Sequence, residues 1–516
     1  MGVVFNTDKR IKMGVWGLGR GKRIVDEAKI LNIDVVAGCD INPHMRENFM
    51  RDIPGAFVTG DENEFLAQDF DVVLIATFIF DHARHTIKAL EAGKHVLCEV
   101  TPFITPAEGV QVVEAVEKSG KIYNLMENYP FSKANLYLTK RWQEGFFGEL
   151  MYGEFEYAHE VRTLSYAYNV DGGVPVEPGY TVHSWRPVLD SHYYNSHSFG
   201  AIMKVTGCRP ASVSAVSCGV TLPGHIEDEN IRNRGTLCPS IIKMTNGALV
   251  KNLVGASTGD YHFCGRLWGT KASAEVRKND LTIRIGACGA GEPLKIKPEW
   301  PAYGEHAEKT DHGGADFWEL YYFARQYFTG ETAPWDIYSA CDVALTGIMA
   351  ARSTENNGVF MDVPDFRDKA LREKYRNDHW KSRNFEFDTE RIFPEGHDKI
   401  ITSRFTKLMT DLYPLYLDHG IPVWNMAMDG MKLYNDTLEP YGKLRIIEHV
   451  ERLVHCLPQL AEDCKFARQL ADMYPDCAAG KTLEKVLASL DLKKIMDVEN
   501  TLAELREFLE NRYKIR

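Results

Sequence analysis

Short apolar runs alternate with amphipathic stretches through the first part of the chain. Four of these runs have the length and composition of strands: Ile11–Trp16, Asp34–Cys39, Asp71–Thr77 and His95–Cys98. The third is almost continuously apolar, as expected for a strand buried on both faces of a parallel sheet. Between the last two, the stretch His82–Ala92 predicts a helix that is capped by Gly93. This alternation predicts an α/β domain with a doubly wound parallel sheet over residues 1–128.

The pattern changes from Leu150 onward, where apolar and polar residues alternate in several runs that glycine and proline separate. These runs are Met151–Ala158, Ala211–Val220, Ser240–Val254 and Leu281–Ile285. Strand-like runs mixed with helical stretches predict a second, α+β domain with an open and largely antiparallel sheet. We assign this domain to residues 129–366.

We assign residues 367–516 to a linker and a helical C-terminal extension. Charged sequence continues to about Asp398, and helical periodicity follows it. Two apolar stripes recur at helical spacing, namely Ile447, Val450, Val454 and Leu457, and then Ile495, Val498, Leu502, Leu505 and Leu509. Such stripes are usually core, so we expect the extension to pack on the body, with a dimerisation or lid role as the alternative.

Composition and charge exclude several classes of protein. The chain has 516 residues, of which 44% are hydrophobic and 26% charged, as in ordinary globular proteins. Its net charge of −12 disfavours non-specific nucleic-acid binding, which needs a basic surface. No apolar run reaches about 18 residues and no targeting segment stands at the start, so we expect a cytoplasmic protein without a membrane span. Eleven scattered cysteines without a CxxC pair predict reduced thiols and no metal site.

A glycine-rich turn follows the first predicted strand. Gly17, Gly19 and Gly21 stand between that strand and the predicted helix Lys22–Ile30, where a tight turn can bring a pyrophosphate to a helix N-terminus. The third glycine comes one position before its usual place. Asp40 follows at the end of the second strand, and a carboxylate there accepts hydrogen bonds from the adenosine ribose and repels a 2′-phosphate. These residues predict a Rossmann domain that binds NAD rather than NADP.

The segment DVVLIATFIFDHARHTIKALEAGKHVLCEVTPF resembles the Gfo/Idh/MocA family of NAD(P)-dependent sugar oxidoreductases. The resemblance implies a first domain that binds the dinucleotide and a second domain whose sheet forms the sugar pocket. The cofactor residues that we expect are Gly17, Gly19, Arg20, Gly21, Asp40, Thr77, His82 and Glu99. His82 and His85 lie three apart on the predicted helix, and we interpret them as packing residues rather than as metal ligands.

Two departures from the family pattern weaken a simple dehydrogenase interpretation. The family has Glu-Lys-Pro after its fourth strand, whereas this chain has Glu99, Val100 and Thr101, without the lysine. Many members have Asp-x-x-x-His before a helix of the second domain. Here the histidine aligns with His197, but the aspartate aligns with Tyr193. Two of the three residues of the usual dehydrogenase triad are therefore replaced.

These replacements resemble those of one branch of the family, the NAD-dependent α-N-acetylgalactosaminidases, which are glycosidases on the same fold. The resemblance rests on MENYPFSKANLYLTKRWQEGFFGELMYGEFEYAHEVR, on YYNSHSFG, and on HGGADF with DVPDF. It covers about residues 10–366 and leaves the helical extension outside. It implies that Tyr157 and His197 are catalytic, with His159 beside them. The substrate contacts that we expect are Asn128, Arg186, Tyr194 and His312.

In the mechanism that this resemblance implies, NAD⁺ oxidises a ring hydroxyl at C3, which acidifies the hydrogen at C2. A base removes that hydrogen, the C1 substituent is eliminated, water adds, and NADH returns the hydride without net redox change. Tyr157 is the candidate C2 base, His197 the group on the oxidised hydroxyl, and His159 an acid or orienting partner; the Tyr and His roles are exchangeable. Tyr157 and His159 are two apart on a predicted strand, so they share one face.

Other functions stay open on the residues alone. The first alternative is a net NAD-dependent sugar or glycoside 3-dehydrogenase. A non-catalytic NAD or sugar sensor is the second, and the acid–base residues argue against it. An ordinary two-carboxylate glycosidase is not favoured, because Glu154 and Glu156 have the spacing of solvated residues on a strand. We expect a homo-oligomer that binds a small sugar or glycoside and neither nucleic acid nor a membrane.

Overall fold

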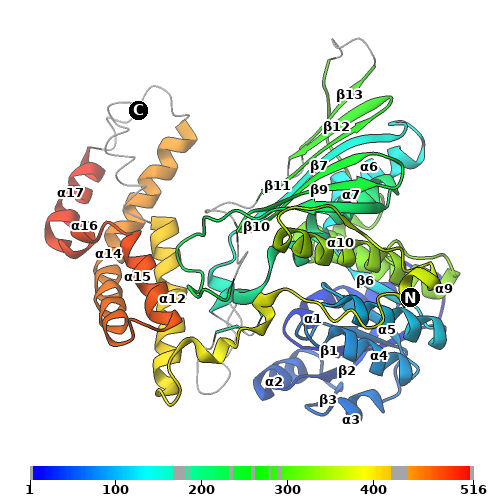
Figure 1. Ribbon diagram of the computed structural model, residues 1–516, viewed down its shortest axis with the longest axis horizontal. Coiled ribbons are helices and arrows are strands. Elements are labelled where there is room, and N and C mark those ends of the chain that lie inside the picture. The colour runs from blue at the N-terminus through cyan, green and yellow to red at the C-terminus, as the bar shows by residue number, and fades with distance from the viewer. Residues whose placement is uncertain are drawn as a thin grey trace.

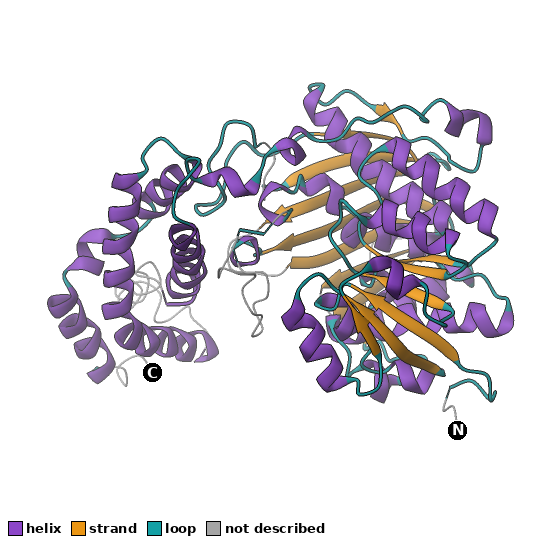
Figure 2. Ribbon diagram, turned by 90° about the horizontal axis from the view of Figure 1, so that it is seen from below, coloured by secondary structure: helices purple, strands orange, loops and turns teal. Residues whose placement is uncertain are grey.

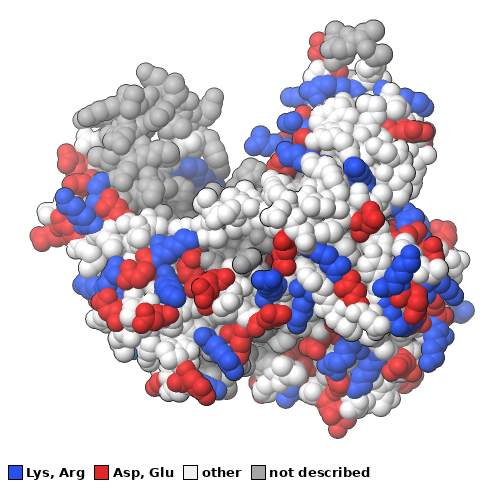
Figure 3. All heavy atoms as spheres, viewed as in Figure 1, with Lys and Arg blue, Asp and Glu red and all other residues white. Residues whose placement is uncertain are grey.

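The computed structural model of the chain has two sheet domains and a helical extension (Figure 1). It describes residues 4–166, 182–183, 185–231, 236–256, 262–277, 280–286, 292–419 and 440–511. Among these residues, no helix is long and apolar enough to cross a membrane. Basic and acidic side chains are interspersed on the face shown in Figure 3.

The N-terminal domain is the doubly wound parallel sheet that the sequence predicts. Its strands are β1 (Ile11–Trp16), β2 (Ile33–Cys39), β3 (Phe57–Thr59), β4 (Val72–Ile75), β5 (His95–Glu99) and β6 (Tyr123–Met126), in the order β3-β2-β1-β4-β5-β6. Its helices are α1 (Arg20–Ile24), η1 (Ala28–Leu31), α2 (Pro43–Asp52), α3 (Glu62–Leu66), α4 (His82–Glu91) and α5 (Pro106–Ser119). The strand order reverses between β1 and β4, and ligands of such sheets bind at that point.

Local sequence explains most of these elements, with one exception. The buried β4 is apolar throughout, and α4 ends before Gly93, whose φ of 77° is in the left-handed region that glycine tolerates. The prediction of a helix over Lys22–Ile30 is wrong. The chain turns between α1 and η1, where Glu27 accepts a hydrogen bond from the imidazole of His306 at 2.9 Å. That contact spans most of the chain, so the local pattern could not show it.

The second domain is built on a nine-stranded mixed sheet with the order β14-β13-β12-β11-β7-β10-β9-β8-β15. The strands are β7 (Leu150–His159), β8 (Pro210–Ala215), β9 (Cys238–Met244), β10 (Leu249–Ala256), β11 (His262–Gly269), β12 (Ala272–Arg277), β13 (Asp280–Ile285), β14 (Leu294–Ile296) and β15 (Met361–Asp362). The central pair β7 and β10 is parallel and the other pairs are antiparallel. The largely antiparallel sheet that the sequence predicts is therefore confirmed.

Two strand predictions in this domain need correction. The run Ser240–Val254 is a hairpin of two strands, because Gly247 turns the chain with a φ of 88°. The run from Ala211 ends as a strand at Ala215 and does not reach Val220.

Helices cover the face of this sheet that looks toward the Rossmann domain (Figures 1 and 2). Of these, α7 (Ser196–Thr206) and α10 (Ile337–Glu355) contact the strands directly and α6 (Lys133–Gln143) packs on α7. The helices α8 (Gly304–Ala307) and α9 (Ala315–Thr329) contact each other, and α9 also contacts η1 of the Rossmann domain. Short 3-10 turns connect them: η2 (Tyr129–Phe131), η3 (Thr163–Ser165), η4 (Arg186–Val188), η5 (Ser191–Tyr194) and η6 (His312–Gly314). The apolar side of α7 is fully buried at Phe199 and Ile202, so this helix is held rigidly against β7.

The linker packs closely on the Rossmann domain. It contains α11 (Lys369–Glu373), η7 (Arg383–Glu386) and η8 (Thr389–Ile392). Arg372 donates two hydrogen bonds to Glu117 of α5, at 2.8 and 2.9 Å. Farther along, the Ser382 hydroxyl donates to Asp190 at 3.0 Å. The linker therefore connects the two sheet domains and fixes where the helical extension begins.

The extension forms the helices α12 (Lys399–His419), α14 (Pro440–Met473), α15 (Ala478–Ala488), α16 (Leu492–Met496) and α17 (Val498–Glu510), which lie to one side of both sheets (Figure 2). Both predicted stripes are helical, although the second is divided between α16 and α17. The extension contacts the body, as expected: Lys485 donates to the Glu227 carboxylate at 2.7 Å, and the Thr482 hydroxyl accepts from the Glu227 backbone at 2.9 Å.

Candidate functional site

One large cavity, of about 1640 Å³, runs from the glycine loop of the Rossmann domain to the helical extension. Every cofactor and substrate residue that the sequence predicts lines it, except Gly21. The cavity also receives side chains from the linker and from the start of α12. The cofactor end, the sheet of the second domain and the extension therefore share one continuous space.

The glycine loop has the geometry that a dinucleotide needs. Gly17 has a φ of 93°, and a Cβ there would lie 2.3 Å from the carbonyl oxygen of Ala76. Gly19 faces open space within 4 Å, which leaves room for a phosphate against its backbone. A Cβ on Gly21 would lie 2.7 Å from Val15, so this glycine serves the close packing of helix on strand although it comes one position early.

Asp40 closes this loop from the end of β2. Its carboxylate accepts hydrogen bonds from the backbone N–H groups of Leu18 and Asn42, each at 2.8 Å. Burial raises the pKa of Asp40, while these two hydrogen bonds lower it. Its remaining lone pairs border the cavity, where the ribose hydroxyls of NAD would donate. Asp40 thus combines a structural task with the predicted ribose contact.

His82 and His85 both line the cavity, and neighbouring groups of the Rossmann domain hold both rings in place. The two ring nitrogens of His82 lie 2.8 and 3.1 Å from the carbonyl oxygens of Thr101 and Thr77, so this buried imidazole joins the loops after β4 and β5. His85 stacks on Trp16 with ring centroids 3.8 Å apart. Burial, with the nearby Arg84 charge, lowers the pKa of His85 to about 3, so its ring is neutral.

A buried ionic junction connects the two sheet domains beneath the cavity. Arg20, directly after Gly19, donates to Glu99 at 3.0 Å and lies 2.7 Å from Asp316. Asp316 also accepts from Asn128 at 3.1 Å and lies 2.9 Å from the ring of His312. Burial lowers the pKa of Arg20, but the carboxylates of Glu99 and Asp316 outweigh it and raise that pKa. These contacts fix the predicted residues of both domains in one arrangement.

His197 is held by a carboxylate that the sequence did not identify. Its Nδ1 lies 2.8 and 3.0 Å from the two oxygens of Glu127, which is fully buried. A carboxylate only accepts, so Nδ1 carries the proton and Nε2 is the basic nitrogen. The rings of Tyr129, Tyr157 and Tyr194 surround the imidazole at centroid distances of 4.7, 4.8 and 4.6 Å. The imidazole is thereby fixed in both tautomer and orientation.

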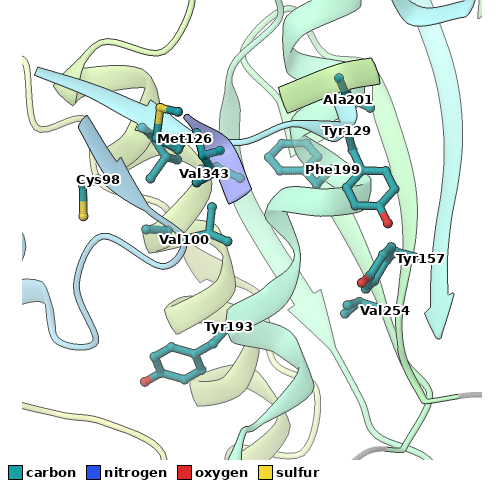
Figure 4. Packing of buried hydrophobic residues seen from close by; sticks show 14 of the residues in the cluster. Cys98, Val100, Met126, Tyr129, Tyr157, Tyr193, Phe199, Ala201, Val254 and Val343 are labelled. Atoms are coloured by element: carbon teal, nitrogen blue, oxygen red, sulfur yellow. The ribbon is translucent and has the colours of Figure 1, made fainter. Parts of the chain in front are cut away.

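Tyr157 and His159 lie beside this histidine on β7. Figure 4 shows the ring of Tyr157 next to that of Tyr129, above Val254. Burial, and then the neighbouring Tyr194, raise the pKa of Tyr157 well above its usual range, although the Arg186 charge opposes this. The surroundings therefore favour the protonated form of the Tyr157 phenol.

The pKa of His159 is shifted in the other direction, toward the form without the extra proton. Its Nδ1 lies 2.7 Å from the backbone carbonyl oxygen of Glu160, so Nδ1 donates and Nε2 is the basic nitrogen. Burial lowers the pKa of His159, which keeps the ring neutral at pH 7. The site thus combines a protonated phenol with two oriented imidazoles.

The position of the missing lysine is apolar in the structure. Val100 is buried and borders the cavity between Glu99 and the second domain. Across the cavity, the guanidinium of Arg186 lies 4.6 Å from the ring of Trp185. Tyr194 is packed between Trp185 and His197.

Three buried acids of the site were missed by sequence reasoning, namely Glu127, Asp316 and Glu319. Glu127 stands in MENYPF, next to the predicted substrate contact Asn128, and Asp316 stands in HGGADF, four residues after the predicted contact His312. Glu319 lies one helical turn after Asp316, and neither of its oxygens has a hydrogen-bond partner among the described residues. Burial and the nearby charges of Asp316 and Glu99 raise the pKa of Glu319 well above its usual value.

Two family models match parts of this chain. Residues 11–128 match the model of the Gfo/Idh/MocA oxidoreductase family, NAD-binding Rossmann fold. Residues 296–373 match that of the glycosyl hydrolase 109 C-terminal domain. NAD is therefore the cofactor of the first domain, and the loop geometry fits it.

Similar proteins carry related names. A glycosyl hydrolase family 109 protein of Shewanella pealeana is 24% identical over 412 residues, covering 71% of this chain and 87% of that protein. An α-N-acetylgalactosaminidase of Shewanella oneidensis is 24% identical over 402 residues, covering 69% and 85%. Among solved structures, a levoglucosan dehydrogenase in complex with NADH has a TM-score of 0.57 at 19% identity, covering 69% of this chain and all of that one.

Proposed function

We propose that this chain, an NAD-dependent enzyme with a Gfo/Idh/MocA Rossmann domain and a glycosyl hydrolase 109 C-terminal domain, cleaves glycosides through transient oxidation of a sugar hydroxyl. The observation that carries the proposal is the grouping of Tyr157, His159 and the His197–Glu127 pair in the cavity that also contains the glycine loop. A redox-neutral cleavage needs several proton transfers, and this site holds several proton-transfer groups.

NAD⁺ supplies the hydride acceptor when bound, and its reduced form supplies the hydride that is returned. The chain's own residues perform the proton transfers. We assign His197 as the base on the sugar hydroxyl that is oxidised, because its Nε2 is basic and the buried Glu127 stabilises the imidazolium that forms. The rings of Tyr129, Tyr157 and Tyr194 pack around the imidazole, which still borders the cavity.

The elimination step needs a base for C2 and an acid for the leaving oxygen. We assign His159 as the base, since its neutral ring presents Nε2 while the Glu160 carbonyl holds Nδ1. We assign the protonated Tyr157 as the acid that gives its proton to the leaving oxygen at C1. This reverses the roles that the sequence suggested for Tyr157 and His159, and the raised pKa of the phenol is the reason.

A net glycoside or sugar 3-dehydrogenase is the second candidate. The His197–Glu127 pair favours it, because an oriented imidazole alone suffices to deprotonate a hydroxyl while hydride leaves. Val100 at the place of the family's lysine favours the glycosidase instead.

A panel of p-nitrophenyl glycosides distinguishes the two. Nitrophenol release and absorbance at the NADH wavelength are followed together in the same cuvette. We expect nitrophenol to accumulate over many turnovers while NADH stays at or below the enzyme concentration. NADH formed in step with substrate consumption, with no nitrophenol, would favour the dehydrogenase.

A further inference from the structure

The chain leaves the sheet of the second domain directly after His159. This histidine is the last residue of β7 and pairs with Ala256 of β10. The direction of its ring depends on the next residue, because Nδ1 donates to the backbone carbonyl oxygen of Glu160 at 2.7 Å. Glu160 lies beyond the strand, so the contacts that hold the chain after β7 also orient the imidazole.

A buried arginine holds the segment that follows β7, residues 160–166. The guanidinium of Arg162 donates to the Glu160 carboxylate at 2.7 and 2.9 Å, and the whole side chain is buried. The same guanidinium donates to the backbone carbonyl oxygen of Pro223 at 2.9 Å. Charge-assisted hydrogen bonds of this kind are strong and directional, so they fix Glu160 relative to the loop that contains Pro223.

Helix α12 of the extension packs on the other end of this segment. The ring of Phe405 lies edge-on to the ring of Tyr166 with their centroids 5.8 Å apart, and both side chains are fully buried. The Tyr166 hydroxyl donates to the backbone carbonyl oxygen of Gly224, the residue after Pro223. The segment after β7 is therefore held between α12 and the loop 221–227.

Helix α15 of the extension holds that loop in turn. The buried Thr482 hydroxyl accepts from the backbone N–H of Glu227 at 2.9 Å. Lys485 donates to the Glu227 carboxylate at 2.7 Å and to the hydroxyl of Thr221. Two helices of the extension thus contact the two segments that fix the Glu160 carbonyl, and both helices lie beyond residue 373, where the glycosyl hydrolase 109 match ends.

We propose that the helical extension is a positioning element of the active site, which holds the imidazole of His159 in its working direction through Phe405, Tyr166 and Arg162. The proposal rests on the proposed function, because His159 is the base of the elimination step there. Phe405 and Tyr166 are positioning residues, and neither lines the cavity.

These contacts act on one of the two proton-transfer histidines. His197 is held by Glu127 instead, so the first hydride transfer does not depend on the extension. A displacement of about 1 Å in a catalytic group can cost about 10²-fold in rate. Removing one contact of the extension is therefore expected to slow proton removal from C2 by about 10–10²-fold and to leave the oxidation of the sugar unchanged.

Two variants test this separation in the full-length enzyme. Phe405→Leu removes the ring contact with Tyr166, and Tyr166→Phe removes a single oxygen, so the second variant gives a result even if the first does not fold. Stopped-flow absorbance with NAD⁺ and a p-nitrophenyl glycoside follows bound NADH and nitrophenol in one turnover. We expect nitrophenol release to slow by about 10–10²-fold while NADH forms at its original rate and accumulates on the enzyme.

Phe508→Leu is the matched control. Phe508 is another buried phenylalanine of the extension, on α17, which packs on α14 and α16. We expect this control to keep both rates. The proposal is overturned if Phe405→Leu and Tyr166→Phe slow both steps together or slow neither, because a contact that only stabilises the fold has no preference for one step.

A measurement without turnover separates this proposal from the proposed function. If the unmodified enzyme releases no nitrophenol, the proposed function fails, and NMR of enzyme labelled with ¹⁵N-histidine still tests the positioning of His159. Its Nδ1–H resonance is identified by its loss in His159→Gln. We expect this proton to exchange with water at least tenfold faster in Phe405→Leu and Tyr166→Phe than in Phe508→Leu. Equal exchange in all three would overturn the proposal.

Discussion

Replacing Glu127 by Gln removes one charge from the site and almost no volume. Glu127 is fully buried and lies 2.8 and 3.0 Å from Nδ1 of His197, and it also accepts from the backbone N–H of Tyr129 at 3.2 Å. A glutamine keeps the shape and one acceptor. It removes the negative charge that stabilises a protonated His197, and an amide turned toward Nδ1 would move the imidazole proton to Nε2.

The size of the effect follows from the role of the carboxylate. In the Ser-His-Asp triad, changing the carboxylate that orients the catalytic histidine to an amide lowers kcat by about 10⁴-fold, and each 1.36 kcal/mol in the barrier is a factor of ten. We therefore expect kcat to fall by roughly 10²–10⁴-fold, as a carboxylate-to-amide change does where the carboxylate orients a catalytic histidine. NAD binding is expected to stay unchanged, because the contacts of Glu127 are with His197 and Tyr129 and not with the glycine loop.

Stopped-flow absorbance of bound NADH, formed in a single turnover, measures this step directly. Glu108→Gln is the matched control, because it replaces a half-buried glutamate that does not line the cavity. The Glu108 carboxylate accepts hydrogen bonds from the backbone N–H groups of Ile104 and Thr105 in the capping box of α5. We expect this control to keep kcat. If Glu127→Gln retained kcat within about threefold while Tm stayed unchanged, the role of the pair in proton transfer would be refuted.

Three further changes test other parts of the site. Asp40→Ala is expected to lower the ratio of NAD affinity to NADP affinity at least tenfold in binding titrations, and an unchanged ratio would contradict the ribose contact. The same change is expected to lower Tm, because the backbone N–H groups of Leu18 and Asn42 lose their acceptor. Tyr157→Phe is expected to reduce glycoside cleavage by about 10²–10⁴-fold and to leave NAD binding intact; cleavage within about threefold of the original would remove Tyr157 from the mechanism. The free energy of unfolding is expected to fall as the pH is lowered from 7.5 to 5.5. The pKa of His85 is about 3 in the folded protein and about 6.5 in the unfolded chain, so the unfolded chain binds more protons in this range. His85 alone accounts for about 1.4 kcal/mol of that loss at pH 5.5, and urea unfolding of His85→Gln should show a smaller pH dependence; an equal dependence would contradict the assignment.

The sequence predicted the Rossmann domain well because its signals are local. Buried parallel strands are apolar along their length, and glycines mark the turn and the helix end. The same local reading missed the hairpin within Ser240–Val254, although the Asn246-Gly247 pair is a turn signal. It also joined α1 and η1 into one helix, because the Glu27–His306 contact is formed by residues far apart in the chain.

The candidate site was predicted by residue type but not by environment. Tyr157, His159 and His197 do line one cavity, as their resemblance to a known motif implied. The partner Glu127 is 70 residues from His197, so only the fold brings the two together. The raised pKa of Tyr157 likewise follows from burial in three dimensions, which no spacing along the chain reveals. The part of the cavity that Lys399 and Thr402 line depends on the extension, which lies outside the recognised pattern.

In the proposed function the sugar is oxidised only transiently while its C1 bond is cleaved. The most direct measurement is to run the reaction in D₂O with a p-nitrophenyl glycoside from the panel, and to examine the released sugar by NMR while absorbance follows NADH. We expect deuterium at C2 of the product and no accumulation of NADH beyond the enzyme concentration. A product without deuterium at C2, together with NADH formed one for one with substrate consumed, would contradict it.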